Sequence, residues 1–402
     1  MMQDLEFRVF DPSPCGFPRP RVPVLPDGVS GLSLWPRRHP RWTPPSNIRH
    51  LSLGRYALRE AYRLAGIGPG SALLAPAYHC RTMIDPALAL GAKVILYPLG
   101  NDLSPTLDAF DNLASRSEWP IRAVLATHFF GLPKPFAALA SWCSQRSIAL
   151  IEDCSHVLQF DRHRPPSTGC YGDFVISSPY KFLPSPDGGV LFARQADRLD
   201  QLRLRPRSYV AEVRGILRAF SLTRDHQRNT GRCQVDSIKH ELAALSETSL
   251  SRGGDSISHE LLSGDYRPAD EGLAPLRFSE FIWRHADISK LARRRQDNYR
   301  RWSAALSAVA GCHRPFPDLP EGCIPYMFPL HVAKPNPHFY LLKHLGMPIW
   351  RWDNIAASDC ATAVNYRLHL LHLPCHQAIA KNEMDWMIQA VKTVLNSEQP
   401  EI

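Results

Sequence analysis

The sequence predicts an α/β fold: a mostly parallel sheet covered by helices, followed by a smaller C-terminal α/β domain. Over residues 50–200, short runs rich in Val, Ile and Leu alternate with amphipathic segments, which is typical of strands buried on both faces. Helical periodicity and further strand-like runs return after residue 285. The 402 residues, 44% hydrophobic and 21% charged, are enough for two domains.

The elements of the predicted large domain, residues 49–204, follow in order. Residues 1–48 are rich in proline and arginine, so we expect an extended, loop-like N-terminal segment. An amphipathic helix comes next, with Leu58, Ala61 and Tyr62 on one face. The later strand and helix patterns of this domain are ALLAP, PALALGAKVILYPL, RAVLATHFFG, FAALASWCSQRSIALIEDCSH, DFVISSPYK and GGVLFAR.

The second half of the chain divides into two predicted parts. Residues 205–275 are polar and turn-rich, which predicts an insertion or linker with two short helical stretches. Residues 276–402 form the predicted small C-terminal domain. Its helix and strand patterns are ADISKLARRRQDNYRRWSAALSAV, YMFPLHVA, HFYLLKHLG, MPIWRW and NEMDWMIQAVKTVLN.

Charge and cysteine usage narrow the class of protein. The formal net charge of +9 lies in short clusters without a nucleic-acid module, so we expect anionic small ligands and no nucleic-acid partner. Ten cysteines are scattered singly, without the paired spacing of a zinc site, which predicts no metal and a reduced cytoplasmic location. The N-terminus does not resemble a secretory signal and no apolar run is long enough for a membrane span, so no membrane association is expected.

Three strand or helix ends carry polar residues that can perform chemistry. Glu152 and Asp153 end an apolar run, where an acid pairs with a cation, binds a protonated ligand nitrogen, or serves as a structural cap. Lys181 lies at the next strand end and is either a surface lysine or a nucleophile for a carbonyl group. Gly54 and Arg55 precede a helix, where free backbone amides suit a phosphate or simply form a turn.

Taken together, the three features match what pyridoxal phosphate (PLP) requires of a protein. Carboxyl ends of parallel strands share one crevice, so the residues can converge on one ligand. A phosphate cradle, an acid for the pyridine nitrogen and a lysine for the aldehyde are the groups that hold this cofactor. The sequence therefore predicts a PLP site.

The chain resembles the DegT/StrS-type sugar aminotransferases, PLP enzymes of fold type I, from about residue 50 to 395. The matching pieces are GRYAL…AGIGPGSALLAPAY, ALALGAKVILYPL, THFFGLP, IALIEDCSH, GDFVISSPYKFLPSPDGG, RRRQDNYRRW and LHLPCHQAIAKNEMDWMIQAV. By this resemblance Lys181 is the catalytic lysine, which forms the Schiff base with the cofactor and then carries the proton of the transamination. Asp153 matches the partner of the pyridine nitrogen, and His156 falls where the family has a glutamine near the ring hydroxyl.

The resemblance also implies a phosphate site, with departures from the family pattern. Arg55 and Tyr56, after Gly54, fall where the family has small residues, and Ser178 is the nearest match to its phosphate-binding serine. In the family this serine lies further before the lysine.

The family's ring-stacking aromatic aligns near Cys80, which is not aromatic. We therefore expect His79 to stack on the ring, with Tyr78 as the alternative.

Three further groups are predicted to be structural. The histidine of residues 128–131 is expected to be buried, and the arginines and tyrosine of residues 294–299 to form a solvated basic helix face. The two tryptophans of residues 350–352 are expected to pack in the core from one face of a strand, with a sugar or nucleotide platform as the alternative.

The resemblance implies a homodimeric transaminase acting on small molecules. The expected donor is an amino acid, glutamate, and the expected acceptor is a keto sugar, nucleotide-linked, in polysaccharide or secondary-metabolite biosynthesis. Two alternatives stay open: a non-sugar keto acceptor, and a non-catalytic relative that keeps the fold for binding or regulation. Dehydrating relatives replace the lysine by histidine, so Lys181 argues against that chemistry.

Overall fold

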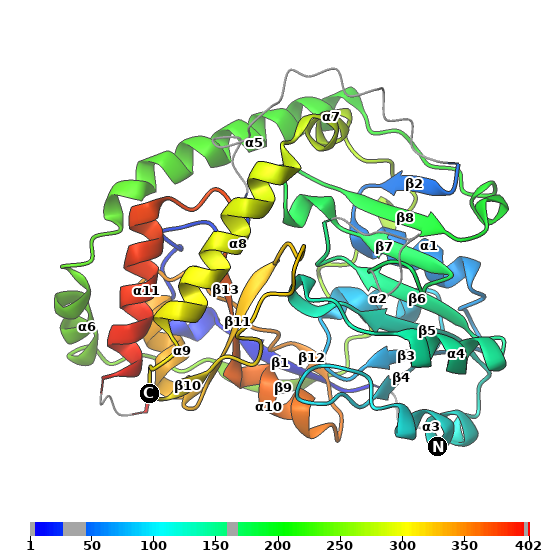
Figure 1. Ribbon diagram of the computed structural model, residues 1–402, viewed down its shortest axis with the longest axis horizontal. Coiled ribbons are helices and arrows are strands. Elements are labelled where there is room, and N and C mark those ends of the chain that lie inside the picture. The colour runs from blue at the N-terminus through cyan, green and yellow to red at the C-terminus, as the bar shows by residue number, and fades with distance from the viewer. Residues whose placement is uncertain (1–4, 27–45, 159–167, 398–400) are drawn as a thin grey trace.

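A seven-stranded, mostly parallel sheet forms one half of the protein, as the computed structural model shows (Figure 1). The structure describes residues 5–26, 46–158, 168–397 and 401–402. The strand order is β2-β8-β7-β6-β5-β3-β4. Strands β4, β3, β5, β6 and β7 are parallel, and β8 alone runs in the opposite direction, antiparallel to its neighbours β7 and β2. The strands are β2 (Ile48–Leu51), β3 (Ala72–Pro76), β4 (Lys93–Tyr97), β5 (Ile121–Thr127), β6 (Ala149–Cys154), β7 (Phe174–Ser177) and β8 (Gly189–Ala193).

Helices cover both faces of this sheet, because its strands are apolar on both sides. On β5 and β6, Ala123, Leu125 and Ile151 pack with α1 (Gly54–Leu64) and α2 (Arg81–Ala89). Alternate residues such as Val124 and Leu150 face α3 (Phe110–Arg116) and α4 (Ala137–Gln145). The predicted α/β class with a mostly parallel sheet is therefore confirmed.

The C-terminal half is a smaller α/β unit with its own core. Its antiparallel sheet has the order β10-β11-β13, and Trp302, Phe328 and Trp386 lie in the core between sheet and helices. The elements are α7 (Arg277–His285), α8 (Ile288–Ala305), β10 (Cys312–His313), β11 (Met327–Val332), α9 (Pro335–His344), α10 (Ala361–His369), β13 (Leu370–Pro374) and α11 (Lys381–Leu395).

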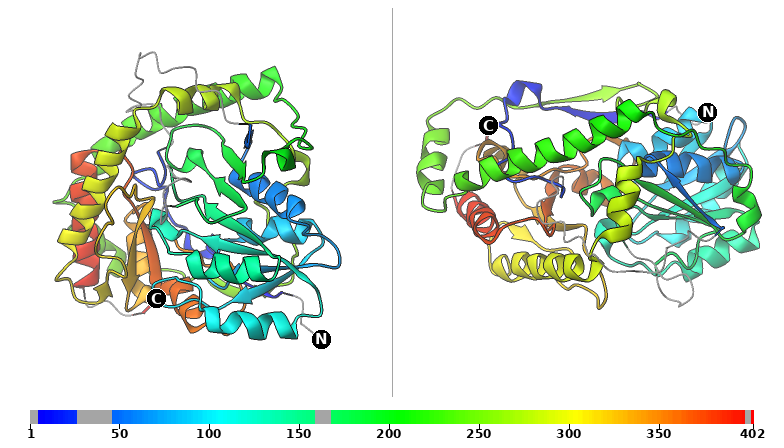
Figure 2. Two further views of the ribbon diagram at one scale, coloured as in Figure 1. Left: turned by 45° about the vertical axis from the view of Figure 1, so that its right-hand side comes forward. Right: turned by 90° about the horizontal axis from the view of Figure 1, so that it is seen from above.

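Residues 5–26 of the N-terminal segment and the polar insertion contain regular structure that the sequence did not predict. Strand β1 (Phe7–Asp11) lies at the centre of a third sheet, between β12 (Ile355–Ala356) and β9 (Gly254–Ser258) of the insertion. The insertion also forms α6 (Ile238–Ser246) and α5 (Tyr209–Asn229), a 21-residue helix along the outer edge of the molecule (Figure 2). A strand that is completed by two distant segments has no local signal in the sequence.

Within the described ranges, no helix combines the length and the apolar character that crossing a membrane requires.

Candidate active site

A narrow cavity with an empty volume of about 400 Å³ lies where β5, β6 and β7 end and α1 begins. In an open parallel sheet, ligands bind at this carboxyl edge. Lining residues come from both halves of the chain: Gly54, Arg55, Leu58, Cys80, Thr82, Met83, Thr127, Asp153, Ser155, His156, Ser178, Tyr180, Lys181 and Trp352. Six of the eight predicted site residues are among them, and Tyr56 and His79 are not.

Asp153 and Thr127 form the buried end of the cavity. They are paired across β6 and β5, and both point to the α1 side of the sheet because side chains alternate along a strand. Asp153 is 2% exposed, and Oδ1 accepts the Ser155 N–H at 2.8 Å. Burial raises the pKa of Asp153, while the nearby Lys181 opposes the shift. The Thr127 hydroxyl is buried and makes no hydrogen bond to the described residues, so a ligand is its available partner.

Lys181 is held by its backbone at the end of a short helical turn, Pro179–Lys181, that follows β7. Its N–H donates to the Ser178 carbonyl at 3.0 Å, and its own carbonyl accepts from Arg295 Nη2 at 3.2 Å. The Lys181 amine lies 5.4 Å from the centre of the Tyr326 ring. This turn directs the amine into the cavity opposite Asp153.

The start of α1 and two serines form the other end of the cavity. A Cβ built on Gly54 would overlap the Ser178 Oγ, so only glycine permits this approach. Ser178 Oγ donates to Ser155 Oγ at 3.2 Å, and both side chains are buried. Arg55 hydrogen-bonds to the Asp265 carbonyl at the cavity mouth. Two hydroxyls, an arginine and a helix N-terminus are suited to an anion.

The His156 imidazole has a defined tautomer. Its Nδ1 accepts the Phe130 N–H at 3.2 Å, and its ring stacks on Tyr326 with 4.2 Å between the centroids. Burial, and then the Lys181 charge, hold the pKa of His156 well below its usual value. The neutral ring therefore carries its proton on Nε2, which is a hydrogen-bond donor beside the cavity.

Two predicted cofactor contacts lie elsewhere. His79 is fully buried outside the cavity, where its Nε2 accepts the Ala356 N–H at 3.2 Å. The Tyr56 side chain points toward the insertion and donates to the Arg267 carbonyl at 3.1 Å. The alternative Tyr78 also lies outside the cavity, bonded through its hydroxyl to His372 at 3.0 Å. Here the cavity is instead lined by Cys80 of the loop after β3 and by Thr82 and Met83 of α2.

Glu152 and His128 form a structural pair on the opposite face of the sheet. Glu152 Oε1 lies 2.7 Å from His128 Nε2, and Oε2 accepts the Tyr171 and Gly172 N–H groups. Burial opposes ionisation of Glu152, but these hydrogen bonds lower its pKa overall. Cys154 lies near both groups. Because the carboxylate is already saturated by the protein, the cluster is explained as an anchor for the loop before β7.

The small domain contributes to the site in a way that the sequence pattern does not indicate. Arg295 and Tyr299 were expected on a solvated face but are 0% exposed. Arg295 donates to the carbonyls of Lys181, Pro325 and Tyr326, and so fastens the lysine turn to the small domain. Trp352 was expected to pack in the core from a strand, but it lies outside any strand and lines the cavity. Neither placement has a local sequence signal, because both depend on contacts between domains.

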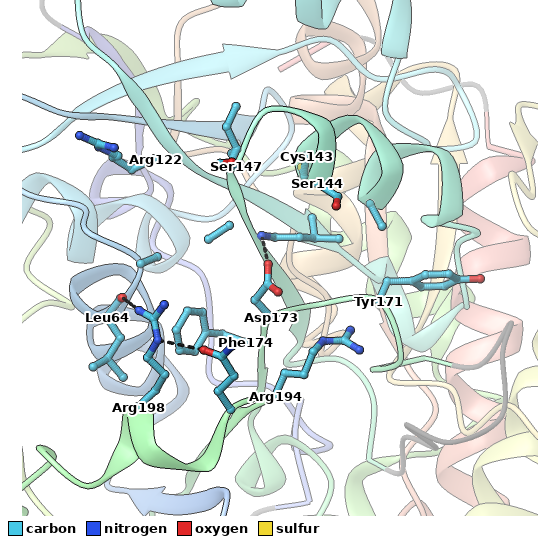
Figure 3. Close-up of a pocket in the computed structure, with 16 residues that line it drawn as sticks. Leu64, Arg122, Cys143, Ser144, Ser147, Tyr171, Asp173, Phe174, Arg194 and Arg198 are labelled. Atoms are coloured by element: carbon cyan, nitrogen blue, oxygen red, sulfur yellow. Dashed lines mark hydrogen bonds between the residues drawn. The ribbon is translucent and has the colours of Figure 1, made fainter.

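A larger groove with an empty volume of about 1370 Å³ lies at the opposite, amino edge of the same strands (Figure 3). Its most prominent side chains are Arg122, Arg194 and Arg198, and all three are exposed. Arg198 is bonded to the Leu64 carbonyl and Arg194 to that of Gly172. No predicted site residue lines this groove, so its size does not make it the better candidate.

Comparisons with known proteins relate this chain to aminotransferases. Residues 51–233 match the DegT/DnrJ/EryC1/StrS aminotransferase family, which confirms the predicted resemblance over this segment. A dTDP-4-dehydro-2,3,6-trideoxy-D-glucose 4-aminotransferase from Saccharopolyspora spinosa is 26% identical over 162 residues, 40% of this chain and 41% of the relative. The chain thus spans less than half the length of this relative.

Solved structures show the same fold at low identity. DesV of S. venezuelae superposes with a TM-score of 0.59 at 16% identity, covering 87% of this chain and 85% of that one. The putative sugar aminotransferase Spr1654 of Streptococcus pneumoniae, in its PLP form, gives 0.58 at 13% identity, covering 88% and 92%.

Proposed function

From the match of residues 51–233 to the DegT/DnrJ/EryC1/StrS aminotransferase family, we propose that this protein is a PLP-dependent aminotransferase. It moves an amino group from an amino acid, glutamate, to a keto sugar that is linked to a nucleotide. The observation that carries the proposal is the convergence of Asp153, Lys181 and the start of α1 on one cavity. These three groups complement the ring nitrogen, the aldehyde and the phosphate of PLP.

The described residues fit this cofactor. The Thr127 hydroxyl is a buried polar group without a partner among them, and Gly54, which has no side chain, allows Ser178 to lie against the start of α1. The anion-binding groups and the buried carboxylate line the same cavity. A flat ligand with a phosphate at one end and a basic nitrogen at the other matches this distribution.

Each residue then has a defined task. When bound, the cofactor supplies an aldehyde that combines with amines and a ring that accepts electrons. Asp153 would hold a proton on the ring nitrogen, and His156 would donate its Nε2–H to the ring oxygen. Lys181 would hold the aldehyde and, once displaced by the substrate amine, move a proton between the substrate and cofactor carbons.

The phosphate would be held by the other end of the cavity. Ser155 and Ser178 offer hydroxyl groups, and the N-terminus of α1, with Gly54 and Arg55, lies beside them. The Arg55 guanidinium is partly engaged by Asp265, so a phosphate would compete with this carboxylate for it.

The substrate assignment rests on the family and on charge. The family relative from Saccharopolyspora spinosa is named for a dTDP-linked keto sugar, and the net charge of +9 favours a diphosphate-linked substrate. We place the reaction in polysaccharide or secondary-metabolite biosynthesis, with a non-sugar keto acceptor as the alternative. None of the ten cysteines, all of which lie in the described ranges, forms a disulfide, which supports a cytoplasmic location.

The test measures cofactor binding and turnover separately. Wild-type protein with PLP is expected to show the visible absorbance of a lysine-bound cofactor and to transfer an amino group from glutamate to a panel of nucleotide-linked keto sugars. Lys181→Ala is expected to lose both, while Lys381→Ala, at an exposed lysine, keeps both. Bound cofactor without turnover on any keto acceptor would support the non-catalytic relative instead.

We also propose that the protein is a homodimer, supported by exposed apolar side chains on α5. Tyr209, Leu217 and Phe220 are 80%, 63% and 58% exposed, along the outer edge of the molecule (Figure 2). Burying this surface against a second copy is favourable. Light scattering of the wild type is expected to give a dimer that Leu217→Glu weakens and Arg218→Glu does not. A monomeric wild type would contradict the proposal.

A further inference from the structure

We propose that Trp352, from the small domain, supplies the aromatic face on which the cofactor ring stacks, in place of an aromatic side chain from the loop after β3. The inference rests on the proposed PLP function and assigns one of its contacts. Loading of the cofactor would then connect the two halves of the chain directly.

The loop after β3 places no aromatic side chain in the cavity on which the cofactor ring could stack. Its two aromatic side chains, Tyr78 and His79, are buried outside the cavity. The side chain that lines the cavity from this loop is that of Cys80, and its Sγ lies 3.1 Å from Oγ1 of Thr82, in the first turn of α2. Burial raises the pKa of Cys80, so the thiol is neutral. A thiol and a hydroxyl offer a pyridine ring little stacking surface.

Trp352 reaches the same region from the other domain. Its ring centroid lies 5.0 Å from Tyr78 and 5.7 Å from His156, so it bridges the β3 loop and the site of the ring oxygen. Phe129 and His372 contact it as well, at 6.0 and 5.4 Å. Despite these neighbours, the side chain is only half-buried and lines the cavity together with Lys181.

The geometry also favours Trp352 over Tyr180, another aromatic residue of the cavity lining. Tyr180 directly precedes Lys181 on the same short turn, so it is tied to the lysine backbone. Trp352 is held by rings on several sides, which fixes the plane of the indole before a ligand binds. A preorganised indole is the stronger stacking partner for an electron-poor ring.

The experiment compares variants of the full-length protein with PLP as the probe. Trp352→Leu keeps an apolar side chain but loses the aromatic face, and Trp352→Phe retains one. Trp350→Leu is the matched control, because Trp350 packs on the same core but does not line the cavity. The readouts are the PLP dissociation constant and the induced circular dichroism of the visible cofactor band.

Trp352→Leu is expected to raise the PLP dissociation constant roughly 3- to 10-fold, the range of one aromatic stacking contact, and to change the dichroism of the bound cofactor. Trp352→Phe should restore most of the affinity, and Trp350→Leu should match the wild type. If Trp352→Leu and the wild type bind PLP equally and with the same dichroism, the inference is wrong while the proposed function stands. If the wild type itself forms no visible band with PLP, the proposed function fails first.

Discussion

The buried Arg295 connects the lysine turn to the small domain, and its replacement by methionine should destabilise the protein. Its guanidinium is 0% exposed and donates to the Lys181, Pro325 and Tyr326 carbonyls at 3.0–3.2 Å, and to Gln377 Oε1 at 2.9 Å. Burial lowers the pKa of Arg295 to about 10, so it remains charged at neutral pH.

The expected loss of stability can be estimated from the hydrogen-bond acceptors that lose their donor when Arg295 is replaced. Each buried acceptor that loses its donor costs about 1–3 kcal/mol, and Arg295→Met removes five hydrogen bonds, of which the one to the Phe182 carbonyl is long at 3.5 Å. Removing a buried charge offsets part of this cost, because no carboxylate is among the acceptors of Arg295. We expect a net loss of about 3 kcal/mol in the free energy of unfolding, together with weaker PLP binding.

The assay is urea unfolding followed by tryptophan fluorescence. The control is Arg293→Met, an exposed arginine on the same helix, which should change the stability by no more than about 0.5 kcal/mol. If Arg295→Met is as stable as this control, the carbonyls find other hydrogen-bond donors, and the proposed stabilising role of Arg295 is refuted.

Three further predictions concern single side chains. Thr127→Val is nearly isosteric and removes a buried hydroxyl that has no partner among the described residues, so it should raise the free energy of unfolding of the apo protein by up to about 1 kcal/mol and weaken PLP binding. If urea unfolding and PLP titration show that stability and affinity both rise or both fall, this prediction is wrong. Gly54→Ala should weaken PLP binding because its methyl group overlaps Ser178, whereas Gly68→Ala, whose methyl group would make only an ordinary contact, should not. If both variants bind PLP as tightly as the wild type, the start of α1 does not hold the phosphate. Burial raises the pKa of Asp187 to about 6, above its unfolded value of about 3.9, so this group makes the folded state less stable as pH rises between these values. Asp187→Asn should make the thermal unfolding temperature depend less on pH between about pH 4 and pH 6, and a pH dependence like that of the wild type would show that Asp187 does not have a raised pKa.

The large domain could be predicted from the sequence because its signals are local. Apolar runs of strand length alternate with amphipathic helices, and Asp153 and Lys181 stand where two of these runs end. The carboxyl edge of a parallel sheet then brings such residues together without further information.

The remaining parts of the site depend on contacts between distant segments. The face of the sheet to which each side chain of a strand points can be predicted, because side chains alternate along a strand. The loop after β3 has no such periodicity, so the sequence did not show that His79 turns away from the cavity. Arg295 reads as a solvated arginine on an amphipathic helix, and only the packing of α8 on the lysine turn buries it. Trp352 likewise meets the cavity only after the two domains pack.

The central claim, that Lys181 and Asp153 operate on PLP, is tested most directly by the absorbance spectrum of the purified protein with PLP, before and after addition of glutamate. We expect a visible band that glutamate converts to the shorter-wavelength, aminated form, and we expect Lys181→Ala to lack this band. A wild type that shows no visible band, or a Lys181→Ala variant that shows the same band, would contradict it.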